Sequence, residues 1–187
     1  MNIVVFCASA NQIDQKYMDC ARELGMGIGQ RKDHLFYGGT NLGLMKEVAT
    51  ATIDSGGDVT GIIPECIYRK GVAAESLGNL IVVPDMKERK QMLRDYADAF
   101  VALPGGWGTF EEISEVITLK HLGQHTKPIV FLNTAGFYDL FFDFCDRSQQ
   151  LGFISENYSK IYKVVSSPEE VLDYLDHYHP EILKSKY

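Results

Sequence analysis

The feature that most constrains the fold is a series of short, continuous apolar runs separated by longer segments with helical spacing. The runs lie at residues 2–7, 34–37, 59–63, 79–83, 99–103 and 129–132. Helical patterns lie between and after them, at residues 14–31, 44–55, 87–97, 109–122, 138–151 and 168–178. Uninterrupted apolar strands are typical of a parallel sheet covered on both faces. The alternation therefore predicts an α/β fold, a Rossmann-like doubly wound parallel sheet with helices on both faces.

Length and charge limit the organisation and the partners. A chain of 187 residues with 45% apolar content can build one substantial core, and it shows no internal repeat, so we expect a single domain over residues 1–187. The formal net charge is −7, and no block of Lys or Arg occurs. Such a chain is a poor match for nucleic acid or for an anionic membrane surface. We therefore expect neither as a partner.

The cysteines and the first residues indicate a cytoplasmic protein. Cys7, Cys20, Cys66 and Cys145 form no CxxC pair and no metal-binding spacing. Free thiols are usual in the cytoplasm. The start of the chain has no basic segment before its short apolar run, which predicts a first strand rather than a signal peptide. No stretch reaches the roughly 18 apolar residues of a membrane helix.

Two glycine-rich turns follow predicted strands at the edge where open α/β sheets bind ligands. The first contains Gly38, Gly39 and Gly43, and the second is the segment Pro104-Gly105-Gly106-Trp107-Gly108-Thr109. Each leads into a predicted helix. Glycines let the backbone pass close to a ligand, and the start of a helix presents unpaired N–H groups and a positive dipole end. Together these features predict a phosphate cradle.

Two common nucleotide motifs are missing. The first strand runs into Cys7-Ala8-Ser9-Ala10-Asn11 without GxGxxG, which argues against an ordinary NAD-binding domain. No GxxxxGK[ST] segment occurs, so hydrolysis of ATP at a P-loop is not expected. The segment 25–29 reads GMGIG, but it falls within a helical pattern, so a helix end is favoured over a ligand role.

The helix after the second turn carries carboxylates whose role the spacing leaves open. Thr109 and Glu112 fit a capping box, in which Glu112 only closes the helix start. Alternatively, a carboxylate one turn from a phosphate cradle lies near the sugar of a bound nucleotide, where it can orient water or stabilise an oxocarbenium ion. Glu115 shares a helix face with Glu112, whereas Glu111 points elsewhere.

A basic pair opens the helix after the strand at residues 79–83. The segment reads Met86-Lys87-Glu88-Arg89-Lys90 and lies at the same edge of the sheet. Arg89 is either part of an exposed charged helix start or a fork that binds phosphate or carboxylate.

Two further features also remain open. His121 and His125 are spaced i, i+4, which suits either a metal clamp or polar residues near a helix end, and the second is favoured. Residues 64–78 form the least regular segment, which is either a lid or partner contact or, as we favour, a surface loop. No metal cluster is visible, and no cofactor is expected.

Four segments of the chain resemble motifs of one known family. Residues 104–112 match PGGxGTxxE, and residues 86–90 resemble MHxRK. Residues 37–45 resemble YGGxxxGLM, and residues 57–64 resemble GGxVTGIIP. The chain thus resembles the Lonely Guy (LOG) family of cytokinin riboside 5′-monophosphate phosphoribohydrolases, often mislabelled lysine decarboxylases.

The resemblance implies a homodimer that hydrolyses the N-glycosidic bond of AMP or of N6-substituted nucleoside 5′-monophosphates. Arg89 and Glu112 would form the catalytic pair. The residues expected to contact the substrate are Ser9, Gly39, Gly43, Met86, Lys90, Gly105, Gly106, Trp107, Gly108, Thr109, Glu111, Glu115 and Thr118. The partner would be a small nucleoside monophosphate.

The chain departs from the family pattern around the nucleotide pocket. Lys87 stands where the family usually has His, Thr40 replaces a frequent glycine, and Leu119 replaces a common Trp. These differences affect base preference more than phosphate binding.

A non-catalytic nucleotide or phospho-cofactor carrier, similar to molybdenum-cofactor carriers, is the alternative function, because a fold alone does not fix activity. Pyridoxal-phosphate decarboxylation is disfavoured, because no lysine is placed convincingly for a Schiff base.

Overall fold

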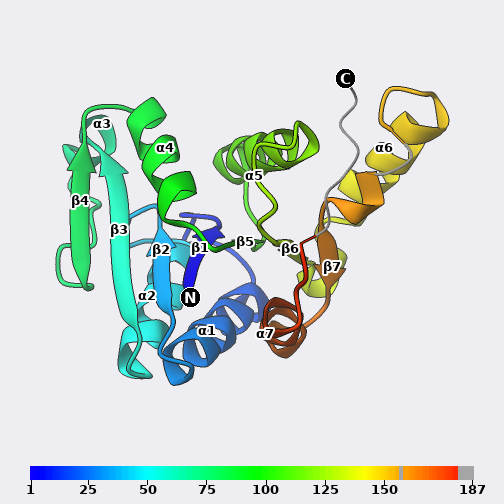
Figure 1. Cartoon of the computed structure of the whole chain (residues 1–187). Helices are drawn as coiled ribbons and strands as arrows, with labels where there is room; N and C mark the ends of the chain where they lie inside the picture. The colour runs from blue at the N-terminus through cyan, green and yellow to red at the C-terminus, as the bar shows by residue number, and fades with distance from the viewer. Residues whose placement is uncertain (156–157, 181–187) are drawn as a thin grey trace.

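The computed structural model describes residues 1–155 and 158–180 and builds them around one parallel sheet (Figure 1). The strand order is β4-β3-β2-β1-β5-β6-β7. The strands are β1 (Asn2–Phe6), β2 (His34–Tyr37), β3 (Asp58–Pro64), β4 (Asn79–Val83), β5 (Ala99–Ala102), β6 (Ile129–Leu132) and β7 (Lys163–Val165). Every pair of neighbours is parallel. The predicted parallel α/β sheet is confirmed.

Helices cover both faces of this sheet. They are α1 (Gln15–Gln30), α2 (Gly43–Asp54), the short α3 (Glu65–Tyr68), α4 (Met86–Tyr96), α5 (Trp107–His121), α6 (Asp139–Gln150) and α7 (Pro168–Asp176), with 3-10 turns η1 (Thr134–Gly136) and η2 (Tyr158–Lys160). In Figure 1, α1, α2 and α7 lie below the sheet, and α4 and α5 lie above it. This arrangement confirms the doubly wound, Rossmann-like architecture.

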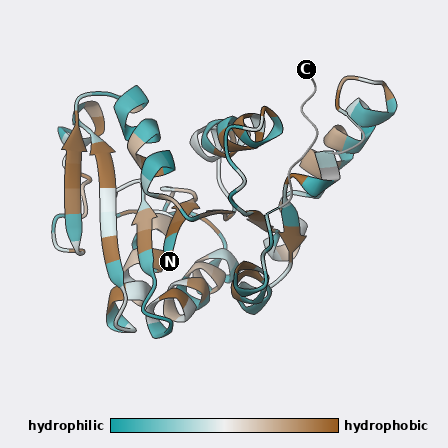
Figure 2. Cartoon of the chain, in the orientation of Figure 1, coloured by the Kyte–Doolittle hydropathy of each residue, from teal (hydrophilic) through white to brown (hydrophobic). Residues whose placement is uncertain are grey.

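The sheet separates two apolar cores, because successive side chains of each strand point to opposite faces. Ile3 and Val5 of β1 pack with α1 and α2, whereas Val4 and Phe6 pack toward α4, α5 and α6. Figure 2 shows the apolar residues concentrated in the strands and on the inner sides of the helices. Continuous apolar strands were therefore the correct signal for a sheet buried on both faces.

The point where the strand order reverses lies between β1 and β5. Strands β2 to β4 follow on one side of β1, and β5 to β7 follow on the other. The ends of the two central strands stay together, since the Ala8 N–H donates to the Pro104 carbonyl at 3.1 Å. Open α/β sheets bind ligands at this reversal, and the second glycine turn follows β5 there.

The glycines at positions 25 and 29 belong to helix packing. A Cβ on Gly25 would lie 2.4 Å from the Val48 carbonyl oxygen, and one on Gly29 would lie 2.4 Å from that of Thr52. Both carbonyls belong to α2, so the glycines allow α1 and α2 to approach closely. The alternative ligand role for this segment is wrong.

The irregular segment between β3 and β4 folds back on the first glycine turn. The Asn41 N–H donates to the Val72 carbonyl, and the Ala74 N–H donates to the Gly39 carbonyl at 3.0 Å. An isolated antiparallel bridge joins Thr40 and Ala73. The segment is therefore a surface loop anchored to the rim of the sheet.

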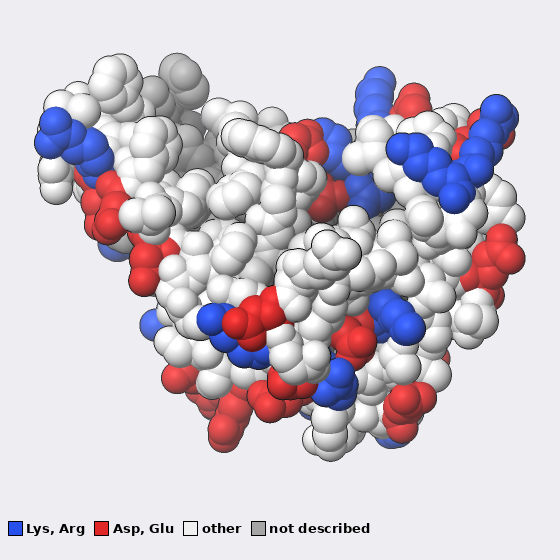
Figure 3. All heavy atoms as spheres, turned by 180° about the vertical axis from the view of Figure 1, so that it is seen from behind, with Lys and Arg blue, Asp and Glu red and all other residues white. Residues whose placement is uncertain are grey.

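The remaining surface is mixed in charge. Figure 3 shows acidic and basic side chains interspersed on the face that it draws. Within residues 1–155 and 158–180, no helix has both the length and the apolar character needed to cross a bilayer.

Candidate active site

Arg89 lies in the interior, although it occupies the first turn of α4. The residue is 5% exposed. Its Nε donates to the Ile62 carbonyl of β3 at 2.9 Å, and Nη1 donates to Glu112 Oε1. A Cβ on Gly38 would lie 2.5 Å from its Nη2. The guanidinium therefore sits under the first glycine turn and binds a carboxylate; the alternative of an exposed helix start is wrong.

Glu112 projects from α5 toward this guanidinium. Its side chain is 5% exposed and forms the buried salt bridge with Arg89. Burial raises the pKa of the Glu112 carboxyl above its ordinary value, the Arg89 charge and hydrogen bond oppose the rise, and the nearby Glu111 adds to it. A carboxylate held in this way is poised to respond to positive charge that develops nearby.

The capping-box role of Glu112 is wrong. Helix α5 begins at Trp107, with Gly106 as a cap that offers no side-chain hydrogen bond. Thr109 and Glu112 therefore both lie inside the helix, and Thr109 cannot act as its cap. Trp107 starts the helix earlier than the Thr-x-x-Glu spacing suggested. This difference frees Glu112 from a local role and leaves the pair with Arg89 as its main interaction.

The second glycine turn is open to solvent where a ligand would approach. Gly106 and Gly108 are exposed, and a Cβ on either would meet no atom within 4 Å. Gly105 differs, because its Cβ would lie 2.1 Å from Thr109 Oγ1. The start of α5 leaves the N–H groups of its first turn available. The turn thus combines one glycine needed for packing with two that leave the backbone bare.

The first glycine turn is packed against its own chain. Gly39 has a φ of 78° and lies beside Ile63 and Leu80. Gly43 has a φ of 53°, and its Cβ would lie 2.4 Å from the Ala10 carbonyl oxygen. The Gly43 N–H already donates to Asn11 Oδ1 at 2.8 Å, so it is not available to a ligand. These glycines shape the wall of the site, and their positive φ values explain why glycine is needed.

Lys90 belongs to α4, and its side chain reaches across to two carboxylates of α5. Its Nζ contacts Glu111 Oε1, and it lies 3.2 Å from Glu115 Oε2. Arg94 Nη1 lies 2.8 Å from Glu115 Oε1, so the pairs form a ladder. The Glu111 and Glu115 hydrogen bonds raise the pKa of Lys90. The ladder clamps the helix that carries Arg89 to the helix that carries Glu112.

The remaining predicted substrate contacts differ in where they lie along the strands and helices. Ser9 is exposed beside Gly43, and Met86 is 38% exposed at the start of α4. Trp107 is 91% exposed at the start of α5. Thr118 lies three helical turns further on, where its Oγ1 donates to the Ser114 carbonyl at 2.8 Å. Ser9, Met86 and Trp107 each follow the carboxyl end of a strand and so lie at the same edge of the sheet, whereas Thr118 lies far along α5.

Two residues near the site were missed by the sequence interpretation. Cys7 directly follows β1 near the pair, and burial raises the pKa of its thiol, with Glu112 adding to the rise and Arg89 opposing it. The thiol is therefore held neutral. Tyr138 is fully buried, and its hydroxyl donates to the Leu103 carbonyl at 2.6 Å, directly before the second glycine turn. Residues this distant in sequence carry no local motif that would reveal them.

The histidine pair does not form a metal clamp. His125 Nε2 lies 2.8 Å from the Val116 carbonyl oxygen, and its Nδ1 accepts from the Lys127 N–H at 3.2 Å. Both ring nitrogens are therefore engaged by the backbone. The described part of the chain contains no group of three or more His, Cys, Asp or Glu side chains arranged to hold a metal ion.

The fold and the site together define a Rossmann-like α/β protein with an open glycine turn and a buried Arg–Glu pair at its topological switch point. Residues 45–175 match the protein-family model described as "Possible lysine decarboxylase". The chain belongs to the LOG family of cytokinin riboside 5′-monophosphate phosphoribohydrolases.

Two plant relatives illustrate the similarity. The chain is 42% identical over 181 residues to cytokinin riboside 5′-monophosphate phosphoribohydrolase LOG2 of Arabidopsis thaliana, covering 96% of this chain and 84% of the relative. It is 43% identical over 181 residues to the LOG phosphoribohydrolase of Oryza sativa subsp. japonica, covering 96% of this chain and 74% of that one.

Solved structures show the same fold at lower identity. The molybdenum cofactor binding protein of Rippkaea orientalis aligns with a TM-score of 0.72 at 20% identity, covering 94% of each chain. A Moco carrier protein of Chlamydomonas reinhardtii aligns with a TM-score of 0.70 at 21% identity, again covering 94% of each chain. Identities this low establish the shared fold alone.

Proposed function

We propose that this protein hydrolyses the N-glycosidic bond of AMP or of N6-substituted nucleoside 5′-monophosphates, releasing the free base and ribose 5-phosphate. The observation that carries the proposal is the buried pair of Arg89 and Glu112 next to an open glycine turn. The plant relatives are named for the same class of reaction.

The open turn suits the 5′-phosphate. Gly106 and Gly108 leave the backbone accessible, and the N-terminus of α5 supplies N–H groups and a positive dipole end. Gly105 and Thr109 support the turn from inside. Phosphate held at this point fixes the ribose relative to the pair, and such positioning lowers the barrier of a bond-breaking step.

Glu112 suits the sugar. As the bond between C1′ and the base nitrogen lengthens, its electrons leave with the base and positive charge grows on the ribose. A carboxylate near C1′ stabilises that charge and orients the attacking water. The water adds its hydroxyl to C1′, and its proton balances the departing base. Arg89 positions the Glu112 carboxylate through their salt bridge and adds positive charge toward the phosphate.

The other substrate contacts follow from placement at the rim. We assign Ser9, Met86, Trp107 and the Lys90 ladder with Glu111 and Glu115 to the edge of the substrate site, with Gly39 and Gly43 shaping its wall. Thr118 lies away from the turn in its own chain, so a Thr118 contact with substrate requires a second subunit.

A homodimer is part of the proposal. Leu140, Phe144 and Phe153 are 83%, 66% and 79% exposed. The last two border an apolar cavity of about 450 Å³ that also includes Ile117 and Phe141, between α5 and α6. Exposed apolar surface of this kind marks interaction sites. We propose that a second copy covers it, and that the segments 113–122 and 137–144 serve both the core and this contact.

The chain is further proposed to act as one domain in the cytoplasm. One sheet contains all described strands, and the four cysteines are unpaired thiols. Reduced thiols fit a cytoplasmic location.

A carrier without catalysis is the competing function. The likeness to molybdenum cofactor binding proteins extends to the fold only, whereas the Arg89–Glu112 pair supplies groups that bond cleavage needs. Incubation of the purified protein with AMP and detection of adenine and ribose 5-phosphate discriminates the two. Binding of AMP without adenine release would favour the carrier. A panel of N6-substituted monophosphates then ranks the substrates.

A further inference from the structure

A pocket distinct from the candidate active site lies near the amino ends of the strands, whereas the catalytic pair lies near their carboxyl ends. It has a volume of about 360 Å³ and is lined by Lys120, Lys160, Tyr162, Lys163, Tyr174, His177, Tyr178 and His179. Helices α5 and α7 and the 3-10 turn η2 end there and β7 begins there, so the pocket gathers residues from four elements and the chain after α7. A volume of this size suits a small ligand.

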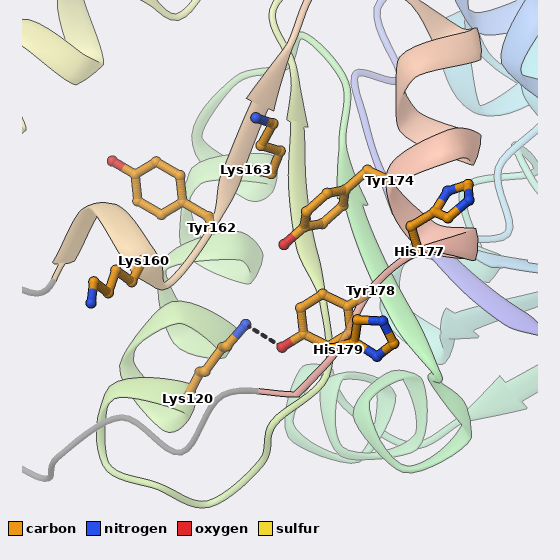
Figure 4. Close-up of a pocket in the computed structure, with 8 residues that line it drawn as sticks. All are labelled: Lys120, Lys160, Tyr162, Lys163, Tyr174, His177, Tyr178 and His179. Carbon is orange, nitrogen blue, oxygen red and sulfur yellow. Dashed lines mark hydrogen bonds between the residues drawn. The ribbon is translucent and has the colours of Figure 1, made fainter.

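The inner wall of the pocket combines a buried ammonium with tyrosine hydroxyls. Lys120 is 4% exposed, and its Nζ lies 3.1 Å from Tyr178 OH, which donates to the Thr126 carbonyl at 2.6 Å. The rings of Tyr174 and Tyr178 lie 5.7 Å apart. In Figure 4 the hydroxyls of these two tyrosines and the Lys120 ammonium face the same central space. The tyrosines offer flat apolar faces as well as polar tips.

The rim adds further positive charge. Lys160 and Lys163 are exposed, and their long side chains extend from the chain just before and at the start of β7 (Figure 4). His177 is balanced by Asp173, whose Oδ1 lies 3.3 Å from its Nδ1. Among the described residues that line the pocket, three are lysines, in a protein whose net charge is −7. Lysines recognise phosphate as point charges.

We propose that this pocket binds a small phosphorylated aromatic compound, with a nucleoside diphosphate as the representative ligand. The phosphates lie at the rim beside Lys160 and Lys163, Lys120 lies on the inner wall, and Tyr174 and Tyr178 contact the ring. The site is separate from the catalytic pair and is independent of the proposed hydrolysis.

Calorimetric titration with ADP tests the proposal. The variant Lys160→Gln/Lys163→Gln removes the two rim charges, and Lys46→Gln/Lys70→Gln removes two exposed charges elsewhere as the matched control. We expect roughly tenfold weaker ADP binding in the first variant and wild-type binding in the second, because only the first pair lies at the pocket. Both variants should release adenine from AMP at the wild-type rate. Trp107 is the single tryptophan of the sequence and lies at the glycine turn. Its fluorescence therefore reports ADP that binds at that turn and distinguishes it from ADP bound in the pocket.

Inorganic pyrophosphate and adenosine separate the two halves of the ligand. We expect ADP to bind several times more tightly than pyrophosphate, and adenosine to bind most weakly, because ring and phosphate both contribute. Equal ADP affinity in both double variants, or no binding to the wild-type protein at millimolar ADP, would overturn the site. Equal affinity for ADP and pyrophosphate would overturn its aromatic part. Failure of AMP hydrolysis in the wild-type protein would concern the proposed function alone.

Discussion

Arg89 and Glu112 form a salt bridge in the interior, at 6% and 5% side-chain exposure, between two helices that flank the ligand-binding edge of the sheet. A buried ion pair adds little to stability compared with apolar residues of similar size, because both charges lose their hydration. This protein nevertheless keeps one where its glycine turn is open. The pair is therefore explained by chemistry at that turn more readily than by packing.

Glu112→Gln should separate catalysis from folding. Gln can still accept the hydrogen bond from Arg89 but lacks the negative charge that stabilises a cationic ribose. We expect adenine release from AMP to fall by roughly 10²–10³-fold. Glu23→Gln, an exposed carboxylate on α1 at the other face of the sheet, is the control and should retain full activity. Kinetics are compared with circular dichroism, and an active, folded Glu112→Gln would refute the assigned role.

Replacing the whole pair should restore stability without restoring activity. Arg89→Ala leaves the Glu112 charge buried and unpaired, which should cost about 3–5 kcal/mol of unfolding free energy. The double variant Arg89→Met/Glu112→Leu should be about as stable as the wild type, since no buried charge remains, and inactive. Urea denaturation and AMP hydrolysis are measured on the same preparations. If the double variant hydrolyses AMP, the pair is structural.

The pH profile should report the environment of Glu112. Burial raises the pKa of the Glu112 carboxyl, so activity should fall on the acid side at a pH above its ordinary value of 4.5. Removing the Glu111 charge should move this limb to lower pH, and Lys90→Gln should move it to higher pH, because Lys90 lowers the pKa of Glu112. The phosphate of free AMP titrates identically in all three assays. Identical acid limbs would show that another group controls the rate.

The same shift has a consequence for stability. Because the pKa of Glu112 is higher in the folded chain than in the unfolded one, its stabilising contribution is present below about pH 4.5 and is lost as the pH rises through the folded pKa. Glu112→Gln removes this dependence. Between pH 4 and pH 8, the unfolding free energy of the wild-type protein should therefore fall relative to that of Glu112→Gln. Parallel curves for the two proteins would contradict this prediction.

The glycine turn contains its own matched comparison. Gly105→Ala places a Cβ 2.1 Å from Thr109 Oγ1, so it should cost roughly 1–3 kcal/mol through overpacking. Gly108→Ala lies within α5 and meets no atom within 4 Å, so it should keep or slightly raise stability. If phosphate approaches this backbone, Gly108→Ala should still raise KM for AMP. An unchanged KM would place the phosphate elsewhere.

Tyr138→Phe tests the support beneath the turn. The variant removes the hydroxyl that donates to the Leu103 carbonyl at 2.6 Å and leaves that buried acceptor without its partner. We expect a loss of about 1–3 kcal/mol in unfolding free energy. Since Leu103 directly precedes the glycine turn, KM for AMP should rise more than kcat falls. Tyr158→Phe, which removes a hydroxyl bonded to Asp146, is the control remote from the turn.

The sequence predicted the sheet and the two turns because their signals are local. Six strands and six helices show their periodicity within single segments, and glycine clusters mark the turns. Strand β7 was missed because it has only three residues, Lys163–Val165, and begins with a charged side chain. The helix start at Trp107 was missed because Gly106 carries no capping side chain, whereas Thr109 imitates a cap.

The roles of the site residues were less accessible from the sequence. Arg89 and Glu112 are 23 residues apart on different helices, so their pairing depends on the packing of α4 and α5 on one face of the sheet. Motifs placed both residues near the ligand edge but could not show that they are buried together. The Lys90 ladder and the Tyr138 hydrogen bond likewise arise from tertiary packing.

The most direct test of the account follows both products of AMP cleavage in the wild-type protein and in Glu112→Gln, by chromatography of adenine and enzymatic detection of ribose 5-phosphate. We predict equimolar adenine and ribose 5-phosphate from the wild-type protein and almost none from the variant, with both proteins folded. Equal release by the two proteins, or no release by the wild type across the panel of nucleoside monophosphates, would contradict the assignment of Glu112 as the group that meets the developing positive charge.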